Sequence, residues 1–212
     1  MSGALAGRVY GIADAGVLGA EGVAPAAAAM AAAGIRTIQV RAKALPGDAF
    51  HRVLEACCRA LEGSGVALWV DDRADLAALF PVAGLHLGQR DLPPAAARRV
   101  VGEGPAIGLS THGDEQLEAA SADPEVAVVA VGPIFATASK ERPDPVIGLE
   151  GLARSRALTA KPLVAIGGID DSNLAAVLAA GADAAAVLGA LCHGDVAANS
   201  RRLVAAAGCA SS

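Results

Sequence analysis

The chain repeats one pattern along its length: a short aliphatic run, then turn residues, then an Ala- and Leu-rich stretch of helical length. The eight runs read VYGIAD, TIQVR, ALWVD, GLHL, AIGLS, AVVAVG, PLVAIGG and AAAVLG. Most of them show no alternation of polar and apolar residues, which is typical of strands covered on both faces. The pattern therefore predicts a parallel sheet packed behind helices.

Helical candidates separate these runs, because parallel strands need a long crossover connection. The candidates are Val23–Ala33, Gly47–Glu62, Arg73–Leu79, Pro93–Val101, Asp114–Ser121, Leu149–Thr159, Asn173–Ala179 and Val196–Ala207. Pro93 is expected to open its helix, and Asp72 and Ser172 are expected as N-caps. Eight strands alternating with eight helices predict an α/β protein, a (β/α)8 TIM barrel forming a single domain over residues 1–212. The alternative is a doubly wound open sheet.

Composition excludes several other classes of protein. Apolar residues make up 54% of the chain and charged residues 18%, which is far from the composition of a disordered protein. The formal net charge of −5 argues against a nucleic-acid binder, which would carry a basic surface. Because aromatic residues are only 2%, Ala, Val, Leu and Ile must build the core.

The cysteines and the hydropathy pattern indicate a compartment. Cys57, Cys58, Cys192 and Cys209 have neither zinc-ligand spacing nor the pattern of a disulfide framework, so reduced thiols are expected. The first residues lack the features of a signal peptide, and the most membrane-like window, residues 174–192, is interrupted by glycine and aspartate. We therefore expect a cytoplasmic protein with no membrane span.

Polar residues gather where the predicted strands end, which is where (β/α)8 barrels build their active sites. Read in order, these positions are Asp14, Gln39, Arg41, Lys43, Asp71, Asp72, His86, Gln89, Asp91, Ser110, His112, Thr137, Ser139 and Lys140. The strand starts carry almost no polar residues. This asymmetry predicts an enzyme that acts on small molecules.

Glycines after the last two strands indicate a phosphate site. Gly167 and Gly168 follow the seventh run and Gly189 follows the eighth, and loops at these positions often hold phosphate in such barrels. Without a Cβ, a glycine lets backbone N–H groups approach an anion closely. The alternative is that the glycine pair serves only a tight turn. The long connection from Gly132 to Gly148 is also expected to be functional.

Two aspartates and three basic residues suggest a metal-assisted phosphate site. Asp72 and Asp91 end neighbouring strands, so their carboxylates are predicted to hold one Mg²⁺ together with substrate phosphate oxygens. Arg41, Lys43 and Lys140 on the same face would balance a pyrophosphate. Taken singly, Asp72 reads as a helix N-cap, Asp91 as a turn residue and the cations as surface charge. The combination favours the metal and phosphate interpretation.

Two histidines stand near this face. His86 alternates with Leu85 and Leu87, so it either points into the barrel mouth or is a hydrogen-bonded core histidine. His112 follows Ser110 in a loop and is expected in the site. No acid partner for Ser110 is evident, so a catalytic triad is not predicted.

Six segments, in the right order and spacing, resemble the thiamine phosphate synthase family from about Val9 to Leu191. They are IQVRAK, VDDRADLA, GLHLGQRDLP, IGLSTH, VGPIFATASK with IGLEGL, and AIGGI. The resemblance implies a transferase that joins 4-amino-2-methyl-5-hydroxymethylpyrimidine diphosphate to thiazole phosphate, with Mg²⁺ as cofactor and release of pyrophosphate. It also implies a dissociative mechanism, in which the bond to pyrophosphate breaks before the thiazole nitrogen attacks.

The resemblance implies roles for individual residues on both substrates. For the pyrimidine diphosphate, the implied residues are Gln39, Arg41, Lys43, Asp71, Ser110 and Lys140, of which Arg41, Lys43, Ser110 and Lys140 form the implied catalytic set. For the thiazole phosphate, they are Thr137, Ser139, Gly168, Leu188 and Gly189. Asp72 and Asp91 are the implied Mg²⁺ ligands, and the implied partners are these small molecules alone.

The chain departs from the usual family pattern at five positions. Asp71 stands where the family usually has Asn, and adds a negative charge beside the diphosphate. It either joins the metal ligands or raises the requirement for Mg²⁺. Ala42 replaces a Glu, Arg90 an acidic residue, Ser139 a Thr and Gly189 a Ser. None of these changes removes an implied cation or metal ligand.

Two other functions stay open on the sequence alone. A related barrel, the thiazole tautomerase, needs no diphosphate site, and a histidine at the position of His112 would be its general acid or base. A non-catalytic barrel that binds a phosphorylated metabolite is the second alternative. The sequence also leaves open whether the chain is a monomer or a homodimer.

Overall fold

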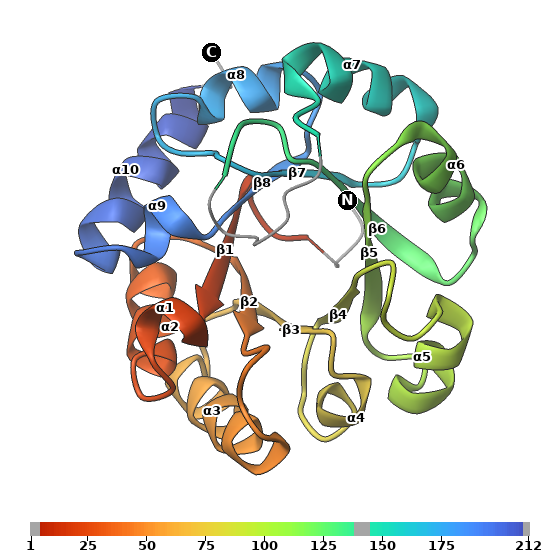
Figure 1. Cartoon of the computed structure of the whole chain (residues 1–212). Helices are drawn as coiled ribbons and strands as arrows, with labels where there is room; N and C mark the ends of the chain where they lie inside the picture. The colour runs from red at the N-terminus through yellow and green to blue at the C-terminus, as the bar shows by residue number, and fades with distance from the viewer. Residues whose placement is uncertain (1–4, 138–144, 210–212) are drawn as a thin grey trace.

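The structure of the chain, a computed structural model, describes residues 5–137 and 145–209. Its strands form a closed parallel barrel in the order of the chain, with β8 paired to β1. The strands are β1 (Val9–Asp14), β2 (Thr37–Arg41), β3 (Ala67–Asp71), β4 (Gly84–Leu87), β5 (Ala106–Thr111), β6 (Val126–Val131), β7 (Leu163–Ile166) and β8 (Ala184–Val187). The view along the barrel shows the strands as an inner ring surrounded by helices (Figure 1). The predicted TIM barrel is confirmed, and the open-sheet alternative is wrong.

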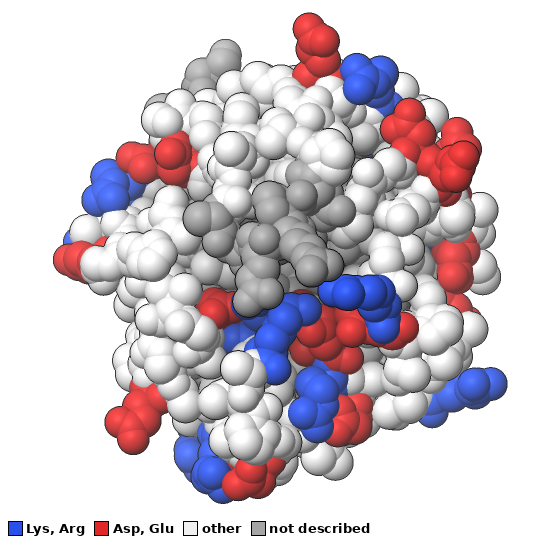
Figure 2. Space-filling view, in the orientation of Figure 1, with Lys and Arg blue, Asp and Glu red and all other residues white. Residues whose placement is uncertain are grey.

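Helices follow the strands at each predicted place. They are α2 (Val23–Ala32), α3 (Gly47–Ala60), α4 (Ala74–Ala77), α5 (Pro94–Val101), α6 (Asp114–Ala122), α7 (Gly148–Leu158), α8 (Leu174–Ala179) and α10 (Val196–Cys209). Two four-residue helices, α1 (Ala15–Leu18) and α9 (Gly189–Cys192), were not predicted. Viewed from the same side, the surface shows acidic and basic side chains next to one another near its centre (Figure 2).

The predicted helix starts need three corrections. Asp72 is not an N-cap, because it lies one residue too early and has a left-handed backbone with φ of 62°. Ser172 is not one either, since α8 begins after Asn173 and the Ser172 hydroxyl donates to Asp170. Pro93 is the residue that precedes its helix, and Pro94 is the first helical residue.

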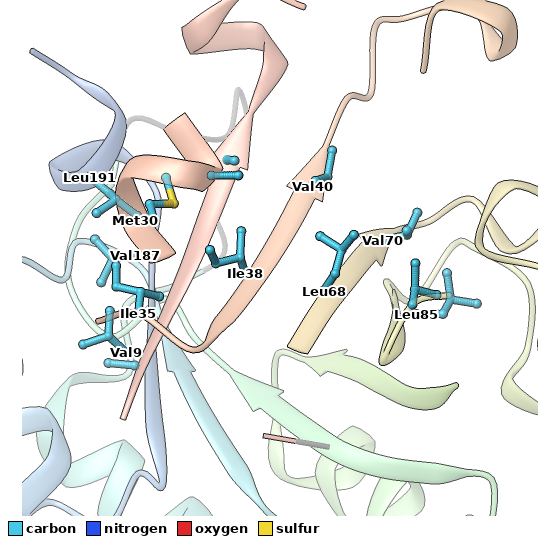
Figure 3. Packing of buried hydrophobic residues seen from close by; sticks show 14 of the residues in the cluster. Val9, Met30, Ile35, Ile38, Val40, Leu68, Val70, Leu85, Val187 and Leu191 are labelled. Carbon is cyan, nitrogen blue, oxygen red and sulfur yellow. The ribbon is translucent and has the colours of Figure 1, made fainter. Parts of the chain in front are cut away.

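The outer layer of the core lies between the strands and the helices. Figure 3 shows side chains of this layer, among them Met30 from α2 and Leu191 from α9 beside strand β1. Gly11 of β1 makes room for them, because a Cβ there would lie 3.1 Å from the Met30 sulfur and 3.2 Å from a Leu191 methyl. Both side chains are fully buried, which stabilises the fold by roughly 1.5–3 kcal/mol each.

The inside of the barrel holds a second, smaller apolar cluster. It contains Tyr10, Ile12, Trp69, Val128, Ala130, Val164, Ala184 and Ala186. Trp69 lies flat against Gly84, where a Cβ would come within 2.4 Å of the indole ring. The rings of Tyr10 and Trp69 lie 5.9 Å apart between centroids. This packing closes the interior below the level of the strand ends.

Alternation along the strands then decides what reaches the mouth of the barrel. Successive side chains of a strand point to opposite faces, so residues two apart share a face. On β3, for example, Trp69 belongs to the inner cluster, Val70 to the outer one, and Asp71 therefore faces inward at the strand end. At the carboxyl end, the inward side chains of β1 to β5 are polar, whereas those of β6 to β8 are apolar.

None of the helices in the described part of the chain is long and apolar enough to cross a membrane.

Candidate active site

The mouth of the barrel has two parts with different chemistry. The ends of β1 to β4 carry linked acidic and basic side chains, which we call the charged cluster: Asp14, Arg41, Lys43, Asp71, Asp72 and Asp91. The ends of β5 to β8 surround a cavity. The sequence predicted that the polar strand ends meet at one rim, and for these residues that prediction is confirmed.

Arg41 lies between two buried carboxylates. Its Nη1 donates to Asp14 Oδ2, and its Nε lies 3.5 Å from Asp71 Oδ2. Asp14 and Arg41 are register partners on β1 and β2, which explains their contact. The other Asp14 oxygen accepts from the Gly16 N–H at 2.7 Å, so the carboxylate is held from both sides. Asp14 therefore orients Arg41, a role that the sequence alone did not assign to it.

Asp71 is a buried carboxylate with incomplete hydrogen bonding. Gln39 Nε2 donates to its Oδ1 at 3.3 Å, whereas Oδ2 has no hydrogen-bond partner among the described residues. Lys43 Nζ lies 3.8 Å from Oδ2, an ion-pair distance. Burial and, to a smaller extent, the charge of Asp72 raise the pKa of Asp71 to about 7, although the nearby Lys43 and Arg41 oppose this shift. An extra positive charge at this point would stabilise the ionised carboxylate.

Lys43, Asp72 and Asp91 continue the cluster toward solvent. Lys43 Nζ donates to Asp72 Oδ2 at 2.7 Å, and the Asp72 carboxyl group lies close enough to that of Asp91 to influence its pKa. Burial raises the pKa of Asp91, and so does the neighbouring Asp72, while the Gly88 N–H that donates to Asp91 at 2.7 Å lowers it. Two neighbouring carboxyl groups concentrate negative charge, which a proton or a cation can offset.

This carboxyl pair fits the ligand preference of Mg²⁺, which takes one or two carboxylates and completes its shell with water and phosphate oxygens. Asp72 is also the residue with strained backbone: a non-glycine residue at φ of 62° costs free energy and often marks a functional position. Within the described residues there is no group of three or more His, Cys, Asp or Glu side chains that could hold a metal. A metal at this point would therefore depend on oxygens from substrate or water.

The cavity has a volume of about 280 Å³ and is mainly apolar with a few polar groups. Its lining residues are Ser110, His112, Gly132, Pro133, Thr137, Ile166, Gly167, Gly168, Ile169, Asp170, Ala186, Leu188, Gly189 and Ala190. Gly167 and Gly168 have φ of 106° and 64°, in the left-handed region that favours glycine. A Cβ at Gly168 would lie 2.5 Å from the Ala136 carbonyl oxygen. The glycine pair thus forms a turn and also lines the cavity.

His86 and Ser110 join the two parts of the mouth. His86 Nε2 lies 2.8 Å from Ser110 Oγ, and Gln89 Nε2 donates to the Ser110 carbonyl at 2.7 Å. Burial lowers the pKa of His86 to about 4, with a smaller contribution from Lys43, so the imidazole is neutral at neutral pH. His86 thus faces inward at the barrel mouth and is also a buried, hydrogen-bonded histidine, so it combines the two alternatives that its sequence position left open. His112 lies in the cavity wall, with Nδ1 3.2 Å from the Gly132 carbonyl oxygen.

The predicted site residues are distributed over these parts. Gln39, Arg41, Lys43, Asp71, Asp72 and Asp91 lie in or against the charged cluster, and Ser110, Thr137, Gly168, Leu188 and Gly189 line the cavity. Ser139 and Lys140 lie outside the described residues.

Fold and site together define a (β/α)8-barrel enzyme for small molecules, with a rim of acidic and basic side chains beside a glycine-lined cavity. Comparison with known proteins then identifies the family. Residues 9–191 match the family described as thiamine monophosphate synthase, and the chain belongs to this family. It is accordingly a transferase of thiamine biosynthesis.

Individual relatives cover most of the chain. A thiamine-phosphate synthase of Koribacter versatilis is 44% identical over 185 residues, which cover 85% of this chain and 87% of the relative. One of Moorella thermoacetica is 40% identical over 173 residues, with 81% and 82% covered. Among solved structures, a thiamine phosphate pyrophosphorylase from Pyrococcus furiosus has a TM-score of 0.86 at 27% identity and covers 97% of both chains.

Proposed function

We propose that the chain joins 4-amino-2-methyl-5-hydroxymethylpyrimidine diphosphate to thiazole phosphate, forming thiamine phosphate and pyrophosphate with the help of Mg²⁺. The observation that carries this proposal is the pairing at one rim of basic side chains and a close carboxyl pair with a glycine-lined cavity. The two substrates each carry phosphate, so such an enzyme needs two anion sites side by side. The names of the relatives support the same reaction.

In this proposal the charged cluster binds the diphosphate. Arg41 is held in place by Asp14, so its remaining N–H groups are oriented without a further entropy cost on binding. Lys43 is half exposed and can turn from Asp72 to a phosphate oxygen. Gln39 and Ser110 contact the pyrimidine end, and Lys140 is assigned to the leaving diphosphate from the family resemblance.

The cavity receives the thiazole phosphate. Gly168 and Gly189 leave backbone space for the phosphate, and Thr137 and Leu188 line the same cavity. Ser139 is assigned beside Thr137 from the family resemblance. Ser110 lines this cavity and also contacts His86, and in this proposal it stands between the two substrates.

The proposed reaction is dissociative. The C–O bond to the pyrophosphate breaks first, and the thiazole nitrogen then attacks the pyrimidinylmethyl cation. Negative charge grows on the leaving pyrophosphate, and Arg41, Lys43 and Lys140 would neutralise it, with Arg41 already oriented by Asp14. Asp72 and Asp91 would hold Mg²⁺, which supplies further positive charge to the diphosphate oxygens.

The test is an assay of the purified chain with both substrates, with and without EDTA. We expect thiamine phosphate only in the presence of Mg²⁺, and a loss of about 10²-fold or more in kcat for Asp91→Asn. Glu55→Gln is the matched control, because Glu55 is a half-exposed carboxylate on α3 that pairs with Arg59. Activity of Asp91→Asn within about threefold of the unchanged protein would contradict the assignment of Asp91. Isomerisation of the thiazole phosphate alone, insensitive to EDTA, would show a tautomerase instead.

A further inference from the structure

The hydrogen bond between His86 and Ser110 can form in two ways, which differ in whether the imidazole or the hydroxyl group donates the proton. His86 Nε2 lies 2.8 Å from Ser110 Oγ, and both atoms are within the inward-facing layer at the mouth. A neutral imidazole has one N–H and one lone pair, and a hydroxyl can donate or accept. Either group could therefore be the donor in this hydrogen bond on distance alone.

The surroundings of the other ring nitrogen decide between the two. His86 and Gly108 are register partners on β4 and β5, and a Cβ at Gly108 would lie 2.7 Å from His86 Nδ1. Nδ1 therefore faces the bare backbone of a glycine, with Trp69 below the same point. It is fully buried and has no hydrogen-bond partner among the described residues.

A buried N–H without an acceptor costs about 1–3 kcal/mol. If the proton were on Nδ1, this cost would apply and Nε2 would have to accept from Ser110. If the proton is on Nε2, the imidazole donates to Ser110 Oγ and Nδ1 keeps only a lone pair. Orphaned donors are rarer than under-used acceptors in folded proteins, so the second arrangement is favoured.

We infer that His86 is a positioning residue: it donates from Nε2 to Ser110 Oγ and so fixes the Ser110 hydroxyl as a hydrogen-bond donor toward the cavity. The serine oxygen is occupied by the imidazole proton, and its own proton turns to an acceptor atom of the bound substrate. Gln89 donates to the Ser110 carbonyl and so holds its backbone, and the bond from His86 holds Oγ, which leaves rotation about the Cβ–Oγ bond to aim the proton. The inference deepens the proposed function, and its kinetic test rests on that function.

The tautomer can be measured without any substrate. In protein with ¹⁵N-labelled histidine, the ring nitrogen shifts of His86 should show a protonated Nε2 and an unprotonated Nδ1 at neutral pH. The His86→Gln variant assigns the signal among the four histidines by its disappearance. A proton on Nδ1 would overturn the inference.

The kinetic test is a double-mutant cycle. Ser110→Ala and His86→Asn should each lower kcat/KM for the pyrimidine diphosphate about 10- to 100-fold, as misorientation of a contact group does. The double variant should lose no more than Ser110→Ala alone, because His86 acts through the serine. His86→Gln, whose amide can reach the same oxygen, should stay within about threefold of the unchanged protein.

Losses that multiply in the double variant would mean that His86 has an independent structural role, and the inference would then fail. Thermal unfolding of each variant separates a folding defect from a loss of orientation. If the unchanged protein forms no thiamine phosphate, the proposed function fails, while the tautomer measurement still decides the role of His86.

Discussion

Asp71 places a carboxylate between the two basic side chains that are proposed to bind diphosphate. Its Oδ2 lies 3.5 Å from Arg41 Nε and 3.8 Å from Lys43 Nζ. These are the groups that an anionic substrate would use, so Asp71 competes with the substrate for them. The usual family residue at this position, Asn, would keep the hydrogen bond from Gln39 without the charge. Asp71 therefore weakens anion binding in this chain unless a cation offsets it.

Removing the negative charge of Asp71 tests whether this residue competes with an anionic ligand for Arg41 and Lys43. We predict that Asp71→Asn binds pyrophosphate about 10-fold more tightly in EDTA, a change of about 1.4 kcal/mol. The measurement is isothermal titration calorimetry at about pH 8, above the pKa of about 7 to which burial and the charge of Asp72 raise this carboxyl group. Unchanged or weaker binding by Asp71→Asn would show that its carboxylate does not oppose the anion.

Sequence reasoning found most of the residues of the mouth but not their partners. The sequence put Asp14, Arg41 and His86 at or near strand ends but left the direction of His86 open, because strands covered on both faces show little alternation of polar and apolar residues. Their contacts depend on strand register: Asp14 stands opposite Arg41, and His86 opposite Gly108. Register between parallel strands leaves no local signal, so the positioning roles of Asp14 and His86 needed the structure.

Among the elements, strands were easier to predict than short helices. Most strands are buried on both faces, so most of them appear in the sequence as short, mainly aliphatic runs. Helices α1 and α9 have only four residues each, too few to show a helical period. The predicted N-cap at Asp72 was wrong because its left-handed backbone turns the carboxylate toward Lys43 rather than toward the helix start.

The turn after β7 should tolerate no side chain at its second glycine. Gly168→Ala places a Cβ in a left-handed conformation and within 2.5 Å of the Ala136 oxygen. We predict a loss of about 2 kcal/mol, which lowers the Tm by about 4–8 °C in a chain of this size. Gly189→Ala is the control for stability, because nothing lies within 4 Å of its Cβ. Equal unfolding temperatures for the two variants would contradict the steric argument.

Helix α3 buries a thiol whose reactivity should report on folding. Burial, and then the neighbouring Cys58, raise the pKa of Cys57 to about 12 from 9.0. Because the folded pKa is the higher one, folding favours the protonated thiol, and this contribution is lost as the pH rises from 9.0 toward about 12. At about pH 8 only one Cys57 in about 10⁴ is a thiolate in the folded chain.

We therefore predict that iodoacetamide modifies Cys57 on the order of 10³ times more slowly in the folded than in the unfolded chain. Tandem mass spectrometry of peptides measures the modification of Cys57 separately from that of the other cysteines. Similar rates in both states would mean that α3 does not bury this thiol.

At the scale of the whole molecule, the barrel gathers more negative than positive charge at its mouth. In the part of the chain that the structure describes, the charged cluster has four carboxyl groups and two basic side chains. The basic side chains that an anion would bind at this rim, Arg41 and Lys43, already form ion pairs with carboxylates of the protein. A divalent cation at Asp72 and Asp91 would offset this excess of negative charge, so cation and anion should favour each other's binding, and by reciprocity the effect is equal in both directions.

This coupling should appear as a stability change of the whole chain, since any ligand of the folded state raises its unfolding temperature. We predict that Mg²⁺ and about 1 mM pyrophosphate together raise the Tm by roughly 5–10 °C, as expected at about 100 times the Kd. Mg²⁺ alone and pyrophosphate alone should each raise the Tm by far less than half as much. In Asp91→Asn, the two ligands together should raise the Tm no more than the sum of their separate effects, because one of the two carboxylates is missing. A full shift by pyrophosphate in EDTA would contradict the charge argument, because Arg41 and Lys43 would then bind the anion without help from a cation.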